Sequence, residues 1–178
     1  MAAGANNYIT VYESQNGGWV LLHPLHGAGE LRGNLEAARI LADEGCRIQL
    51  LPTIAPAEVA LREALLPDVC GNKNPDVRIN GSLIGDIKTP AGERAVRQCV
   101  LNREIYSAAR QGVAVVILNL FDRLYTVQDV RKGIVGALQP CRNRCIQQVW
   151  VITRGRHLFI VPRPVVFDDR IYEPLHRL

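Results

Sequence analysis

Apolar residues recur every three to four positions in several segments of the chain, which is the spacing that one buried helix face requires. This pattern predicts helices over residues 34–45, 56–65, 93–111 and 126–138. Asn34 is the candidate N-cap of the first helix, and Gly45 and Gly112 are placed to end the first and third. Thr126-Val127-Gln128-Asp129 resembles a capping box with aspartate in the last position, and it predicts the start of the fourth helix.

Alternating or mainly apolar runs between these segments predict strands. Their expected bounds are 8–12, 19–22, 47–51, 76–88 as a hairpin, 113–120, 148–153 and 157–161. The run 113–120 has the character of a strand buried on both faces. We expect the first two strands to form an N-terminal hairpin outside the main sheet. The order that follows is helix, three strands, helix and strand, which indicates an α/β fold with a mixed central sheet flanked by helices.

The length and composition suit one globular domain. With 178 residues, 48% of them hydrophobic, the chain can bury a substantial core. We expect a single domain over residues 1–178, with a hairpin and loop in 1–32, the core in 33–161 and a C-terminal tail in 162–178. No apolar stretch approaches membrane-spanning length, and the N-terminus lacks the features of a secretory signal. The expected location is the cytoplasm, with no membrane partner.

Cysteine and histidine spacing does not favour a structural metal site. The cysteines form an odd set without CxxC pairs, which predicts reduced thiols: Cys46, Cys70, Cys99, Cys141 and Cys145. His23 and His26 have no third ligand at metal spacing, so we interpret them as loop histidines.

Positive charge is concentrated in the last third of the chain. Residues 123–163 contain eight basic residues and one acid, Asp129, whereas the remainder is net acidic. A basic third joined to an acidic core suits an enzyme that acts on nucleic acid, because basic side chains hold phosphates; a solvated basic surface or an arginine-rich bias is the alternative interpretation. The candidate nucleic-acid-binding residues are Lys73, Thr89, Arg123, Arg142, Arg144, Arg154 and Arg156.

The segment 74–90 carries the clearest chemical motif, with two carboxylates and a lysine on two short strands joined by Asn80-Gly81. Alternation along a strand places Asp86 and Lys88 on one face and Ile87 on the other. This is the equipment of a metal-dependent phosphodiesterase. Turn chemistry followed by a solvent-facing ion pair is the alternative.

The relation of Asp76 to Asp86 depends on the hairpin register. A two-residue turn at Asn80-Gly81 sets Asp76 opposite Gly85, whereas a three-residue loop with Gly81 in the left-handed region and a bulge sets it opposite Asp86. We expect the three-residue loop, because only that register builds a shared carboxylate site.

Pro75-Asp76, nine further residues and then Asp86-Ile87-Lys88, within this order of elements, resemble the PD-(D/E)xK nuclease superfamily. A larger set of residues resembles the C-terminal tRNase domains of bacterial contact-dependent growth-inhibition toxins. This set is Asn34-x-Glu36-x-Ala38, Leu41-Ala42-x-x-Gly45, Leu50-Leu51-Pro52, Lys73-Asn74-Pro75-Asp76 and Asp86-x-Lys88-Thr89-Pro90. The likeness covers residues 33–120, and the order of elements continues to 161. It implies a restriction-endonuclease-like αβββαβ core.

The resemblance also implies the site. Catalytic roles fall to Glu36, Asp76, Asp86 and Lys88. Asp76, Asp86, Glu36 and the backbone carbonyl of Ile87 would hold Mg²⁺ or Mn²⁺, rather than Zn²⁺, through hard oxygen ligands. Lys88 would orient the attacking water or stabilise phosphate charge. Asp86 occupies a position often filled by glutamate, and the Gln-x-x-x-Tyr pattern of some relatives is absent, although Gln98 and Tyr106 occur in the following helix. Gln98 is therefore a further candidate.

Three functions follow as hypotheses. The first is a tRNA-cleaving toxin, bound by a cognate immunity protein and active in the cytoplasm of a bacterial cell. The second is a DNA endonuclease of the same fold, from a toxin, phage, restriction or repair system, because RNA and DNA both present phosphates. The third is a binding module for nucleic acid or protein that does not cut.

Overall fold

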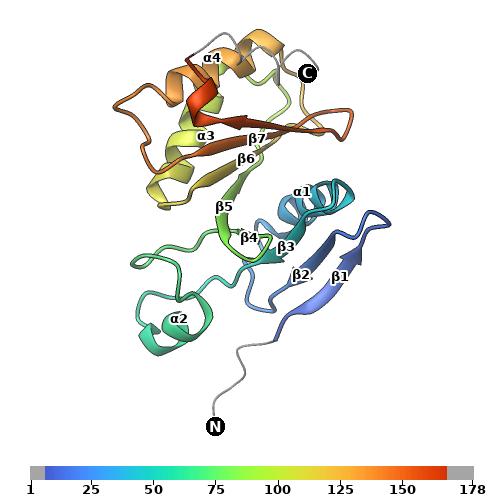
Figure 1. The fold of residues 1–178 in the computed structure, drawn as a ribbon, viewed down its shortest axis with the longest axis vertical. Coiled ribbons are helices and arrows are strands. Elements are labelled where there is room, and N and C mark those ends of the chain that lie inside the picture. Colours follow the sequence, from blue (N-terminus) through green and yellow to red (C-terminus); the bar gives the residue numbers. More distant parts are fainter. Residues whose placement is uncertain (1–6, 168–178) are drawn as a thin grey trace. The chain divides into compact units, whose positions relative to one another are not determined.

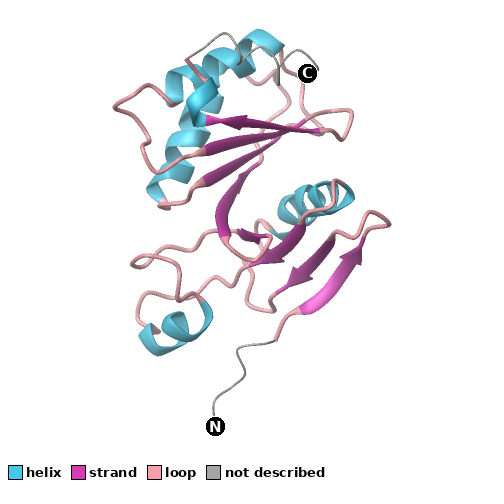
Figure 2. Cartoon of the chain, viewed as in Figure 1, coloured by secondary structure: helices cyan, strands magenta, loops and turns pink. Residues whose placement is uncertain are grey.

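The computed structural model describes residues 7–167, and its internal contacts divide the chain into two compact units, Met1–Ile84 and Gly85–Leu178. Both units combine strands with helices, so the α/β class is confirmed (Figures 1 and 2). The predicted tail of residues 162–178 lies partly outside the described residues. Within those residues, no helix is both long enough and apolar enough to span a membrane.

The first unit is a sheet of four strands in the order β1-β2-β3-β4. Its elements are β1 (Ile9–Glu13), β2 (Trp19–Leu22), α1 (Leu31–Asp43), β3 (Arg47–Leu50), α2 (Val59–Leu65) and β4 (Val77–Ile79). β2 is antiparallel to β1 but parallel to β3, and β4 is antiparallel to β3. The predicted hairpin of β1 and β2 is confirmed, but the expectation that it lies outside the sheet is wrong, because β2 pairs with β3. Val20 of β2 pairs with Ile48 of β3 and is fully buried. The pairing is parallel because helix α1 lies between the two strands in the chain and makes the crossover connection.

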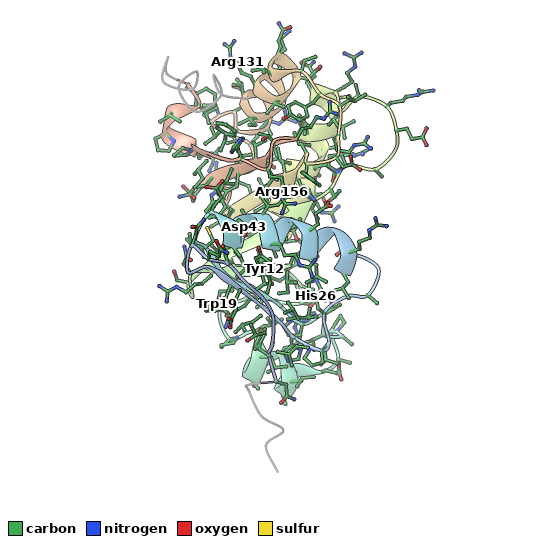
Figure 3. The ribbon with its side chains drawn as sticks, turned by 90° about the vertical axis from the view of Figure 1, so that its right-hand side faces the viewer. Tyr12, Trp19, His26, Asp43, Arg131 and Arg156 are labelled. Carbon is green, nitrogen blue, oxygen red and sulfur yellow. The ribbon has the colours of Figure 1, made fainter. Side chains whose placement is uncertain are left out.

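Helix α1 packs against β2 and β3, and its two ends differ in how well the sequence predicted them (Figure 1). It begins at Leu31, so Asn34 is not its N-cap; Asn34 lies inside the helix and is buried. The C-terminal end is as predicted, because Gly45 has φ +84°, the left-handed conformation that glycine adopts without strain. Tyr12 of β1 donates a hydrogen bond of 2.5 Å to Asp43 at this end of the helix (Figure 3).

The second unit contains the strands β5 (Leu83–Lys88), β6 (Val115–Asn119), β7 (Gln148–Ile152) and β8 (Leu158–Pro162). β5, β6 and β7 are parallel, and β8 is antiparallel to β7. Helices α3 (Gln98–Arg110) and α4 (Val127–Ala137) pack against each other (Figure 2). Every residue of β6 is buried, as predicted for a strand covered on both faces. A 3₁₀ turn, Arg163–Val165, follows β8.

Both helices of this unit begin in ways that local chemistry explains. Thr126 caps α4, accepting a 3.0 Å hydrogen bond from the backbone N–H of Asp129, as the capping-box pattern predicted. Helix α3 begins at Gln98, later than the predicted Glu93. The reason is that Val96 forms a bridge with Tyr125 and donates its N–H to Leu124, so this segment is extended.

The turn at Asn80-Gly81 is a two-residue turn, so the expected three-residue loop with a bulge is wrong. Asn80 has φ 51° and Gly81 φ 84°, and the Ser82 N–H donates to the Ile79 carbonyl at 3.2 Å. Two successive positive φ angles define the type I′ turn. The Asn80 side chain fixes this conformation by accepting the N–H of Arg47 at 2.9 Å.

Gly18 is a position where the fold leaves no room for a side chain. A Cβ added there would lie 2.1 Å from the carbonyl oxygen of Ala42 and 2.8 Å from that of Cys46. We expect Gly18→Ala to destabilise the protein by about 1–3 kcal/mol, because backbone atoms must move to admit the methyl group. The measurement is the urea-unfolding free energy. Gly29→Ala is the control, because a Cβ at Gly29 meets nothing within 4 Å; equal stabilities would contradict the close approach.

Candidate functional site

Asp86 and Lys88 form an ion pair on one face of β5. The Lys88 Nζ lies 2.7 Å from Oδ2 of Asp86, and the two side chains are 17% and 2% exposed. Ile87, between them in the chain, is buried at 5% exposure. The predicted alternation is therefore confirmed: the acid and the lysine share a face. The solvent-facing interpretation of Asp86 is wrong, because its carboxylate is almost completely buried.

Burial changes what this pair means energetically. A carboxylate removed from water is costly unless a partner compensates its charge, and here the Lys88 ammonium is that partner. Removing one member would leave the other charged and buried. The pair is therefore a fixed arrangement that holds the ammonium group of Lys88 in place beside the carboxylate.

The carboxyl ends of the three parallel strands gather polar groups at one edge of the sheet. Thr89 follows β5, Asn119 ends β6 and Thr153 follows β7. Asn119 is 1% exposed; its Nδ2 donates to Oγ1 of Thr89 at 3.3 Å, and its Oδ1 accepts the N–H of Phe121 at 3.3 Å. In α/β sheets, ligands bind outside the carboxyl ends of parallel strands, so this edge is the candidate site of the second unit.

The N-termini of α3 and α4 adjoin each other through Asp129. Its carboxylate accepts the hydroxyl proton of Thr126 at 2.8 Å and the backbone N–H of Gln98 at 3.2 Å, and Arg97 lies 3.6 Å away. These contacts, the Thr126 hydrogen bond foremost, lower the pKa of Asp129. Gln98, the further candidate, is thus the first residue of α3, and its backbone contributes to this junction.

The predicted basic residues divide between the two edges of this sheet. Arg154 and Arg156 lie in the turn after β7, and Arg123 follows β6, all at the carboxyl edge. The Arg156 guanidinium stacks over the Phe121 ring at 5.4 Å. Arg142 and Arg144 precede β7 and therefore lie at the opposite edge; Arg142 donates to the carbonyl of Gly136, in α4.

Arg163 belongs to the basic last third of the chain, but its side chain has a structural role. Within the described residues, every hydrogen bond of its guanidinium goes to a backbone carbonyl. These carbonyls lie in and beside the loop that joins α4 to β7. The acceptors are the carbonyls of Leu138, Gln139, Arg142, Asn143 and Ile146. Part of the positive charge therefore organises the fold.

In the first unit, Asp76 is buried at 6% exposure, and its backbone carbonyl accepts the N–H of Leu51 at 2.8 Å. The loop that precedes Asp76 is held by Arg62, itself only 6% exposed. Arg62 donates to the carbonyls of Ile54, Gly71 and Lys73 and to Oδ1 of Asn74. The predicted motif residues Lys73 and Asn74 are thus fixed in position through a buried guanidinium; the Lys73 side chain is exposed and Glu36, on α1, is half-buried.

His26 supports this part of the first unit (Figure 3). Its Nδ1 lies 2.6 Å from the Leu51 carbonyl, which only accepts, so Nδ1 carries the proton. Its Nε2 lies 3.1 Å from Nδ2 of Asn34 and therefore accepts from the amide. Both ring nitrogens are used in this way. His23 accepts the N–H of Leu25 through Nδ1, and burial lowers its pKa.

The acids and other metal-binding side chains of the described residues do not gather in threes. Within the part of the chain that the structure describes, no three His, Cys, Asp or Glu side chains form a cluster that could hold a metal ion. Asp86 nevertheless offers the hard oxygen chemistry that Mg²⁺ prefers, since the structure gives its buried Oδ2 an ion pair with Lys88 and no hydrogen bond. All five cysteines are free.

Two comparisons with known proteins found a similarity. Residues 73–158 match the family model of the contact-dependent growth inhibition CdiA C-terminal domain. A chain of a solved structure, the CdiA-CT/CdiI toxin and immunity complex from Burkholderia pseudomallei, matches in fold with a TM-score of 0.52. It is 22% identical, and the match covers 78% of this chain and 91% of that chain. No curated protein matches the sequence.

Sequence reasoning missed Asn119, Arg62 and the Asn34–His26 contact. A signal for Asn119 was available, because it is the single polar residue within the apolar run 113–120, which the strand prediction treated as uniform. A lone amide in an otherwise buried strand must find hydrogen-bond partners. Arg62 carried no comparable signal, because its acceptors are three backbone carbonyls and the side-chain oxygen of Asn74.

The Asp129 junction predicts a pH dependence of stability. A carboxyl whose pKa is lowered in the folded state stabilises the protein above its ordinary value of 3.8, and this contribution is lost as the pH falls through the lower folded value. We expect Asp129→Asn to be less stable than wild type at pH 6, with the difference disappearing under acid conditions. Urea unfolding of both proteins across this range measures it, and a difference that does not shrink as the pH falls below 3.8 would contradict the assignment.

Proposed function

We propose that this chain is a metal-dependent endonuclease of the toxin type, which hydrolyses phosphodiester bonds in tRNA. The observation that carries the proposal is the buried Asp86–Lys88 ion pair, 2.7 Å in length, on a strand whose carboxyl end is lined by Thr89, Asn119 and arginines. This strand lies inside the segment that matches the CdiA C-terminal domain. The PD-(D/E)xK resemblance assigns the same two residues to catalysis.

In the proposed reaction a water oxygen bonds to phosphorus, the bond to the leaving ribose oxygen breaks, and that oxygen takes up a proton. Bound Mg²⁺ or Mn²⁺ would polarise the phosphate and acidify the water. Asp86 and the backbone carbonyl of Ile87 are proposed to hold the ion, and substitution of Asp76 and Glu36 tests the two further acids of the predicted set. Lys88, fixed by its ion pair, would orient the water or offset charge on the phosphate oxygens.

A cognate immunity protein is the proposed partner. Support comes from the matched structure, which is a toxin and immunity complex. In this proposal the immunity protein covers the basic residues at the carboxyl edge of β5, β6 and β7. An acidic surface on the immunity protein would bind these residues and would keep nucleic acid away from them. The proposed site of action of the toxin is the cytoplasm of a bacterial cell.

Incubating the purified protein with total tRNA and, separately, with plasmid DNA tests the activity, each with Mg²⁺ and with EDTA. We expect fragments of tRNA only when the metal is present, and intact DNA. Metal-dependent nicking of the plasmid would assign a DNA endonuclease instead. If the protein binds either nucleic acid without cleaving it, the result would support a non-catalytic binding module instead.

Substitutions that conserve shape test the site. We expect Asp86→Asn and Lys88→Met to reduce cleavage by about 10²-fold or more, because each removes a charge required in the transition state. Asp122→Asn is the matched control, since Asp122 is an exposed acid of the same unit. Initial rates with tRNA measure the effect, and circular dichroism checks folding, because loss of one partner of a buried pair is destabilising. Full activity of Asp86→Asn would refute this site; Asp76→Asn and Glu36→Gln extend the test.

The division of the arginines predicts unequal contributions to binding. In the inactive Asp86→Asn background, we expect the double change Arg154→Ala/Arg156→Ala to weaken tRNA binding and to reduce the slope of log K against log salt by about 1–2. The double change Arg142→Ala/Arg144→Ala removes the same charge at the other edge and should alter binding less. Fluorescence anisotropy over a salt series measures both; equal effects would mean that binding does not depend on the carboxyl edge.

A further inference from the structure

The turn that joins β7 to β8 contains a residue in an unfavourable backbone conformation. Arg156 has φ 60°, in the left-handed region that residues with a side chain seldom adopt. The Arg156 N–H donates to the Thr153 carbonyl at 3.0 Å, and the Thr153 N–H donates to the His157 carbonyl at 3.0 Å. These bonds close a three-residue hairpin loop, whose last residue is left-handed and is favourably glycine. Gly155 directly precedes Arg156 but has no left-handed φ, so the arginine occupies the position that glycine would suit.

The side chain of Arg156 reaches a second loop of the same unit. Its Cζ lies over the ring of Phe121, 5.4 Å from the ring centroid, which is a cation–π contact. Phe121 follows β6 and is half-buried, and its N–H donates to Oδ1 of the buried Asn119 at 3.3 Å. The ring is therefore a fixed support for the guanidinium. Arg154, the other arginine of the turn, has neither a left-handed φ nor a ring contact with a described residue.

A strained backbone conformation persists when something other than stability requires the residue that adopts it. Glycine at position 156 would suit the turn better, but it would place no charge there. A guanidinium donates a planar fork of N–H groups that matches two phosphate oxygens, and it also packs on aromatic rings. A strained, exposed arginine supported by a ring, with further arginines at the same edge, therefore fits the phosphodiester backbone as its ligand.

We infer that Arg156 is the arginine of this turn that contacts the phosphodiester backbone of bound nucleic acid, and that Phe121 is a positioning residue that holds its guanidinium for this contact. The inference rests on the proposed function. It separates two arginines that charge alone treats as equal. Arg156 touches the nucleic acid, whereas Phe121 acts through Arg156.

Single substitutions test the role of Arg156, with tRNA binding measured in EDTA to stop the proposed cleavage. We expect Arg156→Ala to weaken binding about tenfold and to reduce the slope of log K against log salt by about 1, because one phosphate contact is lost. Arg154→Ala removes the same charge two residues away and should weaken binding less, by about threefold at most. Fluorescence anisotropy over a salt series measures both, and equal losses would overturn the inference.

Replacing the guanidinium by an ammonium group separates its shape from its charge. Arg156→Lys keeps the positive charge but loses the planar fork. The affinity for tRNA should therefore fall, while the salt slope stays that of wild type. Full affinity in Arg156→Lys would show that charge alone is sufficient and would contradict the contact that we infer.

A double-mutant cycle tests the role of Phe121. Phe121→Leu removes the ring but keeps an apolar side chain and leaves the charge unchanged. We expect it to weaken tRNA binding by about two- to fivefold when Arg156 is present and to have no effect in the Arg156→Ala background, because its contribution passes through the guanidinium. The same loss in both backgrounds would refute the positioning role.

Stability distinguishes a functional from a structural role at position 156. Glycine adopts the left-handed conformation without strain, so Arg156→Gly should unfold at a urea concentration no lower than that of wild type. It should nevertheless bind tRNA as weakly as Arg156→Ala. An arginine that serves only the fold would give lower stability in Arg156→Gly, and that result would overturn the inference.

The outcome also separates this inference from the proposed function. If wild type binds and cleaves tRNA but Arg156→Ala binds normally, the nuclease stands and the role of Arg156 is rejected. If the substrate is DNA, the same variants are compared with a DNA duplex, because both nucleic acids have a phosphodiester backbone. A wild-type protein that neither binds nor cleaves nucleic acid rejects both.

Discussion

The parallel pairing of β5, β6 and β7 is the constraint on which the second unit depends. Because the three strands run in the same direction, the residues that end each of them must emerge at one edge. The connecting helices α3 and α4 then begin near that edge, with Asp129 between their N-termini. This edge therefore collects the partial positive charge of two helix N-termini together with Lys88 and three arginines. The common direction of the three strands is what brings these groups to the same edge.

Local patterns predicted the elements well where one short-range interaction decides the structure. Thr126 and Asp129 are three residues apart, and Gly45 needs only its own φ angle. Alternation likewise predicted that Asp86 and Lys88 share a face, because it follows from strand geometry. Long-range pairing was not predictable in this way. Nothing near Trp19–Leu22 shows that this strand pairs in parallel with Arg47–Leu50, since that depends on how α1 packs.

The candidate site shows the same division. The motif in the sequence identified Asp76, Asp86 and Lys88, and the resemblance added Glu36, but residue type could not show which arginines occupy which edge. Arg142 and Arg154 are close in sequence, yet β7 lies between them and separates them by its whole length. The turn at Asn80-Gly81 was misjudged for another reason. Asn-Gly is the local signal of a type I′ turn, and the three-residue loop was expected only because it would bring two carboxylates together.

Arg62 and Arg163 show why a chain rich in arginine need not have an equally basic surface. Each guanidinium offers five N–H groups in a fixed plane, enough to satisfy several carbonyls of an irregular loop at once. Arg163 has a further consequence for the order of folding. Its acceptors precede it by 17 to 25 residues, so the loop between α4 and β7 cannot complete its hydrogen bonds until β8 has paired and delivered Arg163. The order of this loop is therefore coupled to the pairing of β8 with β7, although the loop itself belongs to neither strand.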